Sequence, residues 1–143
     1  LGGMSIINIE PSFLPEFYTD RWITHSNITE VGDCSIDVIY GSHSLEHVQD
    51  IDSFKKEVSR VLKPGGYLFW EVPNAESDSN GAQKNRVDIP HTYYFKADFF
   101  NKWFSEVLLC DGYEQSQRFD VIQNWHKYKD KKGSVVRALG RLV

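Results

Sequence analysis

The sequence is poor in cysteine and in long apolar runs, and each shortage excludes a class of protein. Cys34 and Cys110 are the two cysteines, with no C-x-x-C pair and no histidine at metal-ligand spacing, so no metal site or redox pair is predicted. No apolar stretch approaches the roughly 20 residues that cross a bilayer, and the first residues do not resemble a signal peptide. We therefore expect reduced thiols and a soluble, cytoplasmic protein that has no membrane partner.

Positive charge is also in short supply. The chain has 16 Lys and Arg residues against 20 Asp and Glu residues, which gives a formal net charge of −4. A nucleic-acid surface needs clustered basic side chains, and the one basic run, residues 127–132, is interrupted by Tyr128 and Asp130. We expect that run to be a solvated turn and no nucleic acid to be a partner.

What the sequence does contain is the composition of one ordinary globular domain. Its 143 residues are 41% hydrophobic and 25% charged, and 14% are aromatic, which is a high share. We therefore predict a single domain over residues 1–143 with an aromatic-rich core.

The middle of the chain has the pattern of strand, helix and strand. Residues 36–40 (IDVIY) and 67–72 (YLFWEV) are apolar runs typical of strands covered on both faces. Between them, a helix capped by Asp50 or Asp52 has one apolar stripe, formed by Phe54, Val58, Val61 and Leu62, and Lys63-Pro64-Gly65-Gly66 ends it. Strands connected in this way are parallel, so the polar loops after each should lie at the same edge of the sheet.

The flanking segments are less regular. Residues 5–9 and 21–25 are expected to be short strands, residues 75–90 a long polar loop that resembles a lid, and residues 97–110 a helix ended by Asp111-Gly112. Residues 113–125 alternate well enough for one or two strands, one of them an antiparallel edge. The tail, residues 134–143, fits either a helix or a strand.

Four motifs in this order carry a family resemblance. They are the SxDVI strand with its LEHV loop (residues 35–48), RVLKPGGYLFWEVPN (60–74), HTYYFKADFF (91–100) and CDGYE (110–114). Together they resemble the small-molecule branch of the class I S-adenosylmethionine-dependent methyltransferases. The resemblance implies an α/β fold, a Rossmann-like, mostly parallel sheet flanked by helices and shortened at the N-terminus.

The same resemblance implies which residues would contact the cofactor, S-adenosylmethionine. Glu10 would hold the ribose hydroxyls, Gly2 and Gly3 would be the remnant of the glycine-rich loop, and Asn27 would accept a hydrogen bond from the adenine amino group. The loop of Gly41, Ser42 and His43 would line the methionine end.

In the family, the first strand lies mid-sheet between the second and fourth strands. Here only a few residues precede the segment that resembles the second strand, too few to form that first strand. Three interpretations stay open: the segment 5–9 occupies that position, a second molecule donates a strand, or the sequence is a fragment of a longer protein. A homodimer is therefore one expected form of assembly.

Two histidines are candidates for proton transfer. His91 follows the polar loop and His43 follows the central strand, and a neutral imidazole at either place could take a proton from an acceptor hydroxyl. Each could equally be a structural histidine. Glu46 and His47 form a pair typical of the family and could simply organise their own loop by local hydrogen bonds, the role that we favour for His47. No metal is expected.

We thus expect methyl transfer from S-adenosylmethionine to a small-molecule or glycan-like acceptor. The rival interpretation is a degenerate methyltransferase-like domain that serves as a binding or assembly module. A nicotinamide-dependent enzyme is a distant third, because no G-x-G-x-x-G opens a helix.

Overall fold

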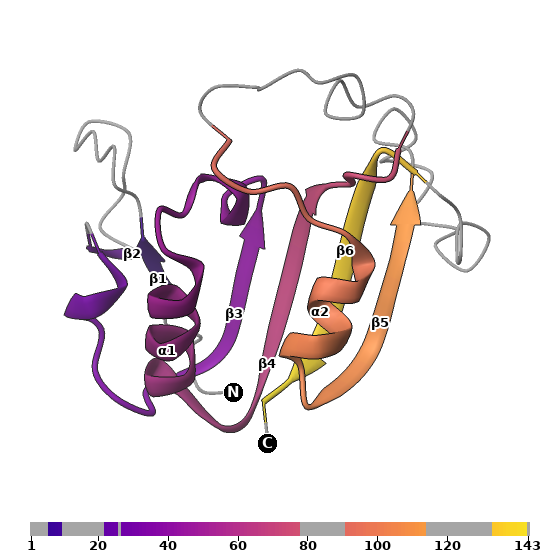
Figure 1. Ribbon diagram of the computed structural model, residues 1–143. Coiled ribbons are helices and arrows are strands. Elements are labelled where there is room, and N and C mark those ends of the chain that lie inside the picture. The colour runs from indigo at the N-terminus through magenta and orange to yellow at the C-terminus, as the bar shows by residue number, and fades with distance from the viewer. Residues whose placement is uncertain (1–5, 10–21, 26, 78–90, 114–132, 143) are drawn as a thin grey trace.

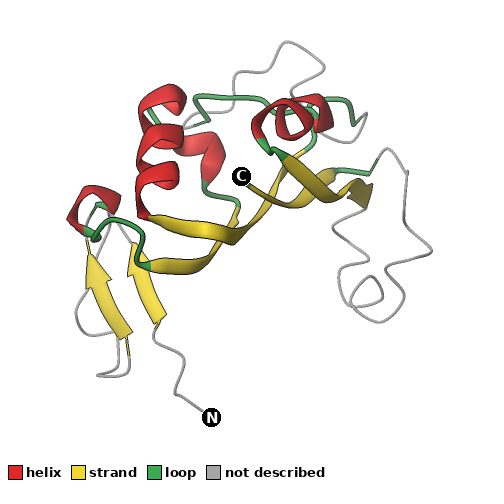
Figure 2. Cartoon of the chain, turned by 90° about the horizontal axis from the view of Figure 1, so that it is seen from below, coloured by secondary structure: helices red, strands yellow, loops and turns green. Residues whose placement is uncertain are grey.

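A computed structural model of the chain describes residues 6–9, 22–25, 27–77, 91–113 and 133–142. Its centre is a four-stranded sheet in the order β3-β4-β6-β5, built from β3 (Ile36–Ser42), β4 (Leu62–Pro73), β5 (Glu106–Tyr113) and β6 (Val135–Arg141). β3 and β4 are parallel, whereas β6 runs antiparallel to both β4 and β5. Two helices, α1 (Ile51–Val61) and α2 (Ala97–Trp103), lie on the same face of this sheet (Figures 1 and 2). The expected α/β class and helix-flanked sheet are confirmed. The four-stranded sheet is mixed, because β3 and β4 pair in parallel whereas β6 pairs antiparallel with both of its neighbours.

The helix α1 forms where its local signals predicted it. The Asp50 carboxylate accepts hydrogen bonds from the backbone N–H groups of Asp52 and Ser53, which caps the helix. A hydrogen bond from the Ser53 hydroxyl, together with these two backbone hydrogen bonds, lowers the pKa of Asp50. The helix ends at Val61 and β4 follows directly, with Gly65 near its start at a positive φ of 76°. The strand–helix–strand unit is therefore confirmed, with β4 beginning earlier than expected.

A second, two-stranded parallel sheet contains β1 (Ile6–Ile9) and β2 (Trp22–His25). It lies on the β3 side of the main sheet (Figures 1 and 2). Within the described part of the chain, β3 is hydrogen-bonded to a single strand, β4. β1, the described part of the segment 5–9, pairs with β2 and not with β3, so the interpretation that this segment fills the mid-sheet position beside the central strand is wrong.

The helix expected over residues 97–110 is shorter than predicted. α2 ends at Trp103, and residues 106–113, including the expected Asp111-Gly112 stop, form β5. The apolar spacing of this segment suits a helix locally, but β5 pairs along its whole length with β6 from the far end of the chain. The tail is therefore a strand. Of the strands expected over residues 113–125, Tyr113 ends β5 and the rest lies outside the described residues.

The core lies between the sheet and the two helices. Its centre consists of Leu68, Trp70 and Val72 of β4 with Phe100, Trp103 and Phe104 from α2 and its C-cap, all 8% exposed or less. Trp70 stacks on Trp103 at 6.0 Å between ring centroids. The aromatic-rich composition is thus explained mainly by this core.

Part of the opposite face of the sheet, along β3 and the start of β4, is exposed to solvent, which corrects the expectation that both central strands are covered on both faces. Val38 and Tyr40 are 57% and 61% exposed, and Tyr67 is 37% exposed. The described helices cover only the other face (Figure 2). A continuous apolar sequence could not reveal this, because it does not distinguish buried faces from exposed ones. No helix among the described residues has the length and apolar character needed to span a membrane.

We predict that the two free cysteines differ sharply in reactivity. Cys34 is exposed, whereas half-buried Cys110 donates its S–H to the carbonyl of Ala97, 3.6 Å away. Burial, reinforced by the negative charges of Asp111 and Asp98, raises the pKa of Cys110 to about 11. Because the thiolate is the nucleophile, iodoacetamide at pH 8 should label Cys34 first.

Mass spectrometry of the native protein should find Cys110 labelled roughly 100-fold more slowly than a thiol at its ordinary pKa, and labelled readily after denaturation in urea. Fast native labelling of Cys110 would contradict the burial of β5 against α2.

Candidate functional site

The parallel strands β3 and β4 end together at the top of the sheet in Figure 1. Polar side chains of Ser42, His43 and Glu71 meet there. The backbone N–H of His43 donates to the carbonyl of Glu71 (2.9 Å), and the Ser42 hydroxyl donates to the Glu71 carboxylate (3.1 Å). Ser42 and Glu71 face each other in register on neighbouring parallel strands. The two loops therefore meet at one edge, as the parallel strands predicted.

His43 sits in a constrained turn. Its φ is 48°, in the left-handed region that non-glycine residues rarely adopt. Its Nδ1 lies 3.6 Å from Oε1 of Glu46, and its Nε2 lies 3.9 Å from Oε1 of Glu71. The imidazole therefore lies between the carboxylates of Glu46 and Glu71.

The short helix η3 (Leu45–His47) presents Glu46 and His47 at the same edge. The segment that follows the polar loop binds to it, because the N–H groups of Thr92 and Tyr93 both donate to the carbonyl of Glu46, at 2.8 and 3.2 Å. This contact brings His91 beside His47, with 4.9 Å between ring centroids. The predicted candidates His43 and His91 therefore both lie close to the Glu46 carboxylate.

Two further contacts fix this edge. The Tyr93 hydroxyl bonds to the carbonyl of Gln49 and accepts from the N–H of Ile51, so the segment is tied to the start of α1. Asn74 forms an isolated parallel bridge with Phe95. These contacts fix the position of the segment 92–95 at this edge.

The other predicted cofactor residues have different positions. Gly2, Gly3 and Glu10 lie outside the described residues. Asn27 uses its side-chain oxygen to cap η2 (Ile28–Glu30) by accepting from the N–H of Thr29. Gly41 lies against the ring of Trp70, where a Cβ atom would overlap the indole. Their roles toward a cofactor stay predictions, as does the lid over residues 75–90, most of which is also outside the described residues.

Sequence reasoning missed one residue of this edge, Glu71. It is 7% exposed, and it contacts both Ser42 and His43. The sequence did contain a signal for it, a single acid near the end of the apolar run YLFWEV. A charged side chain in a buried strand usually has a specific partner or ligand and seldom serves packing alone.

Comparisons with known proteins agree with this geometry. The family model described as "Methyltransferase domain" matches residues 3–107. A protein of Mycolicibacterium smegmatis named "Probable S-adenosylmethionine-dependent methyltransferase" is 31% identical over 102 residues, which are 70% of this chain and 38% of that protein. A sterol 4-C-methyltransferase of Caenorhabditis elegans is 29% identical over 63 residues, 43% of this chain and 19% of that protein. The chain thus spans well under half the length of these curated relatives.

The fold has a solved counterpart as well. The crystal structure of a SAM-dependent methyltransferase from Archaeoglobus fulgidus superimposes with a TM-score of 0.63 at 15% sequence identity, over 93% of this chain and 73% of that one. At this identity the likeness concerns the fold alone.

Proposed function

Because the chain belongs to the methyltransferase domain family, we propose that it binds S-adenosylmethionine and takes part in methyl transfer to a small-molecule or glycan-like acceptor. The observation that carries the proposal is the meeting of two polar loops at the carboxyl ends of parallel strands, where open α/β sheets bind their ligands. Fold likeness alone would not indicate a function.

The described residues fit the positively charged methionine end of this cofactor. The edge holds a buried carboxylate, Glu71, at 7% exposure beside Ser42 and His43, and a sulfonium cation is favoured beside negative charge. The ribose end would depend on Glu10, and the chain near Gly2 and Gly3 would approach the rest of the cofactor. When bound, the cofactor supplies an activated methyl group, so the donor carries the difficult chemistry.

The protein would then have three tasks. The loops of His43 and His91 would hold the acceptor in line with the methyl group, because transfer depends chiefly on orientation. The aromatic and apolar side chains beneath the edge would keep it dry. His91, or His43, would accept the proton that an acceptor hydroxyl loses.

Calorimetric titration with S-adenosylmethionine and its demethylated product tests the proposal. We expect one site of micromolar affinity, and we expect Glu10→Ala to weaken it at least tenfold because two charge-assisted hydrogen bonds to ribose are lost. Asp52→Ala, which removes an exposed acid of α1, is the matched control and should bind normally.

The rival function is a binding or assembly module that keeps the scaffold without the cofactor. The open apolar face with Val38, Tyr40 and Tyr67 is the observation that favours it. If calorimetry detects no binding of S-adenosylmethionine at millimolar concentration to a folded sample, the result would support the module and reject the enzyme.

A further inference from the structure

Glu46 is buried without the partners that a buried carboxylate requires. It is 1% exposed, and neither of its side-chain oxygens has a hydrogen-bond partner in the described structure. The histidine nitrogens nearest to it, on His43 and His47, are 3.6 and 4.0 Å from Oε1, beyond hydrogen-bond length. A buried charge without a partner costs roughly several kcal/mol. A cation bound beside this carboxylate would remove that cost.

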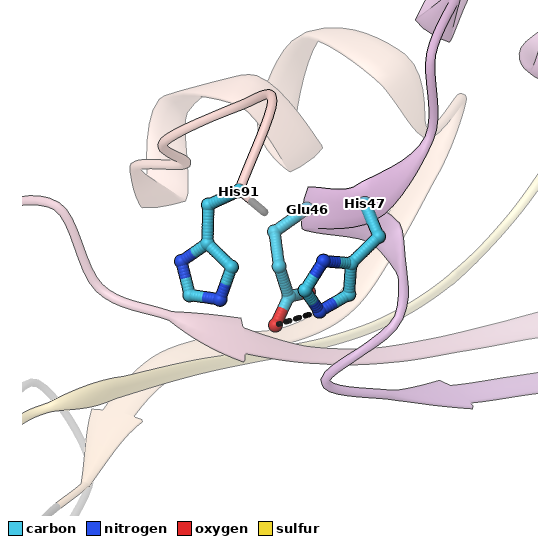
Figure 3. Close-up of side chains that lie close together, drawn as sticks. All are labelled: Glu46, His47 and His91. Atoms are coloured by element: carbon cyan, nitrogen blue, oxygen red, sulfur yellow. Dashed lines mark ion pairs between the residues drawn. The ribbon is translucent and has the colours of Figure 1, made fainter. Parts of the chain in front are cut away.

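Two imidazole donors stand beside it. Each of Glu46, His47 and His91 offers one ligand atom, and these atoms all lie within 4.8 Å of one another. In Figure 3 the His91 and His47 rings flank the Glu46 carboxylate. Donor atoms that bind one ion at about 2.1 Å lie at most about 4.2 Å apart, so a small rotation of the side chains closes the set.

The backbone makes this approach a property of the fold. The N–H groups of Thr92 and Tyr93 bind the carbonyl of Glu46 itself, so the segment that carries His91 is anchored one residue away from the cluster. Glu46 and His47 are adjacent, whereas His91 lies far along the chain, and the hydrogen bonds from Thr92 and Tyr93 to Glu46 hold the two segments together. A metal site needs this kind of support around its ligands.

We propose that Glu46, His47 and His91 bind a divalent transition-metal ion such as Zn²⁺ at the rim of the sheet. Two imidazoles and one carboxylate suit Zn²⁺ or Fe²⁺ better than Mg²⁺, which prefers oxygen ligands. Three protein ligands leave a coordination position open, as in catalytic and not structural sites. The His47 side chain is 39% exposed, so an ion could reach the cluster from solvent at this residue. The open position would take water or an oxygen of a small molecule.

Titration of the chelator-treated, desalted chain with zinc chloride tests the site without any cofactor. Calorimetry should find one Zn²⁺ per chain with micromolar or tighter affinity, and Mg²⁺ should bind at least tenfold more weakly. Glu46→Gln and His91→Ala should each reduce Zn²⁺ affinity by about 100-fold or more. Loss of a residue that only hydrogen-bonds to a metal ligand costs about 10–100-fold, and loss of the ligand itself should cost at least as much. Cobalt titration, followed by its visible absorption, should show an imidazole-ligated band that both variants lose.

His25→Ala removes a histidine of β2 and is the matched control, which should bind Zn²⁺ normally. Circular dichroism shows whether Glu46→Gln is folded. If that variant is unfolded, His91→Ala still tests the site, because His91 lies in a connecting segment outside the helices and strands. An absence of binding, or binding that neither variant weakens, would overturn the proposal. Because S-adenosylmethionine is titrated separately in chelator, failure of the metal site and failure of the proposed function give different results.

Discussion

Replacing Arg137 by methionine should lower the free energy of unfolding by about 3–5 kcal/mol, the effect of removing one partner of a buried ion pair. Arg137 lies in β6 and Asp111 in β5, directly opposite each other in register. The guanidinium donates to both oxygens of the carboxylate, at 2.6 and 3.2 Å, and the two side chains are 8% and 1% exposed. The variant would leave the Asp111 charge inside the protein without this partner.

The loss should spread to the candidate site. Arg137 is also in register with Glu71 of β4, and Glu71 is in register with Ser42 of β3, so a row of polar side chains crosses all four strands. Because Glu71 accepts the Ser42 hydrogen bond, loosening β6 removes support from the rim that carries His43.

Urea denaturation followed by circular dichroism measures the effect. The double variant Arg137→Met with Asp111→Leu should regain most of the loss, because a buried ion pair can be exchanged for apolar side chains at little cost. Lys63→Met is the control, since it breaks an exposed cross-strand pair with Asp37 and should cost about 1 kcal/mol or less. Equal losses for Arg137→Met and Lys63→Met would contradict the burial of β6.

Replacing Gly41 by alanine should have the second largest effect, a loss of about 1–3 kcal/mol or more from overpacking. Gly41 is opposite Trp70 in the parallel pairing of β3 and β4, and the indole fills the space that a Cβ would need. Trp70 is 3% exposed and packs between Phe54 and Trp103, so it has nowhere to move without disturbing the core.

Thermal unfolding and tryptophan fluorescence together detect this change. Gly32→Ala is the matched control, because the nearest atom to its new Cβ is the Ser35 hydroxyl oxygen at 3.9 Å, an ordinary contact. We expect Gly32→Ala to stay within about 0.5 kcal/mol of the parent and to leave the emission unchanged. If Gly41→Ala behaves in the same way, then β3 and β4 do not pack as described.

Several parts of the structure were predictable because their signals are local. The Asp50 cap, the apolar stripe of α1 and the glycine-containing connection specify a helix from adjacent residues alone. The strand–helix–strand order then implies parallel pairing, and with it the meeting of the loops after Ser42 and Pro73. The family resemblance rested on these same segments, and the match over residues 3–107 confirms it.

Other parts depend on residues that meet only in three dimensions. The spacing of Phe100, Trp103 and Phe104 suits a helix that could have continued to Cys110, and pairing with β6 determines that residues 106–113 are a strand. The exposure of β3 is likewise decided by what covers it and not by its own composition.

The sequence by itself therefore determined the central α/β unit and its family, since helix caps, periodicity and turn residues act over a few positions. The tertiary structure alone decided that the tail joins the sheet between β4 and β5, that Arg137 neutralises Asp111, and that His91 lies beside Glu46. The physical reason is that strand pairing, charge compensation and burial depend on distances between residues far apart in the chain, and no local pattern encodes those distances.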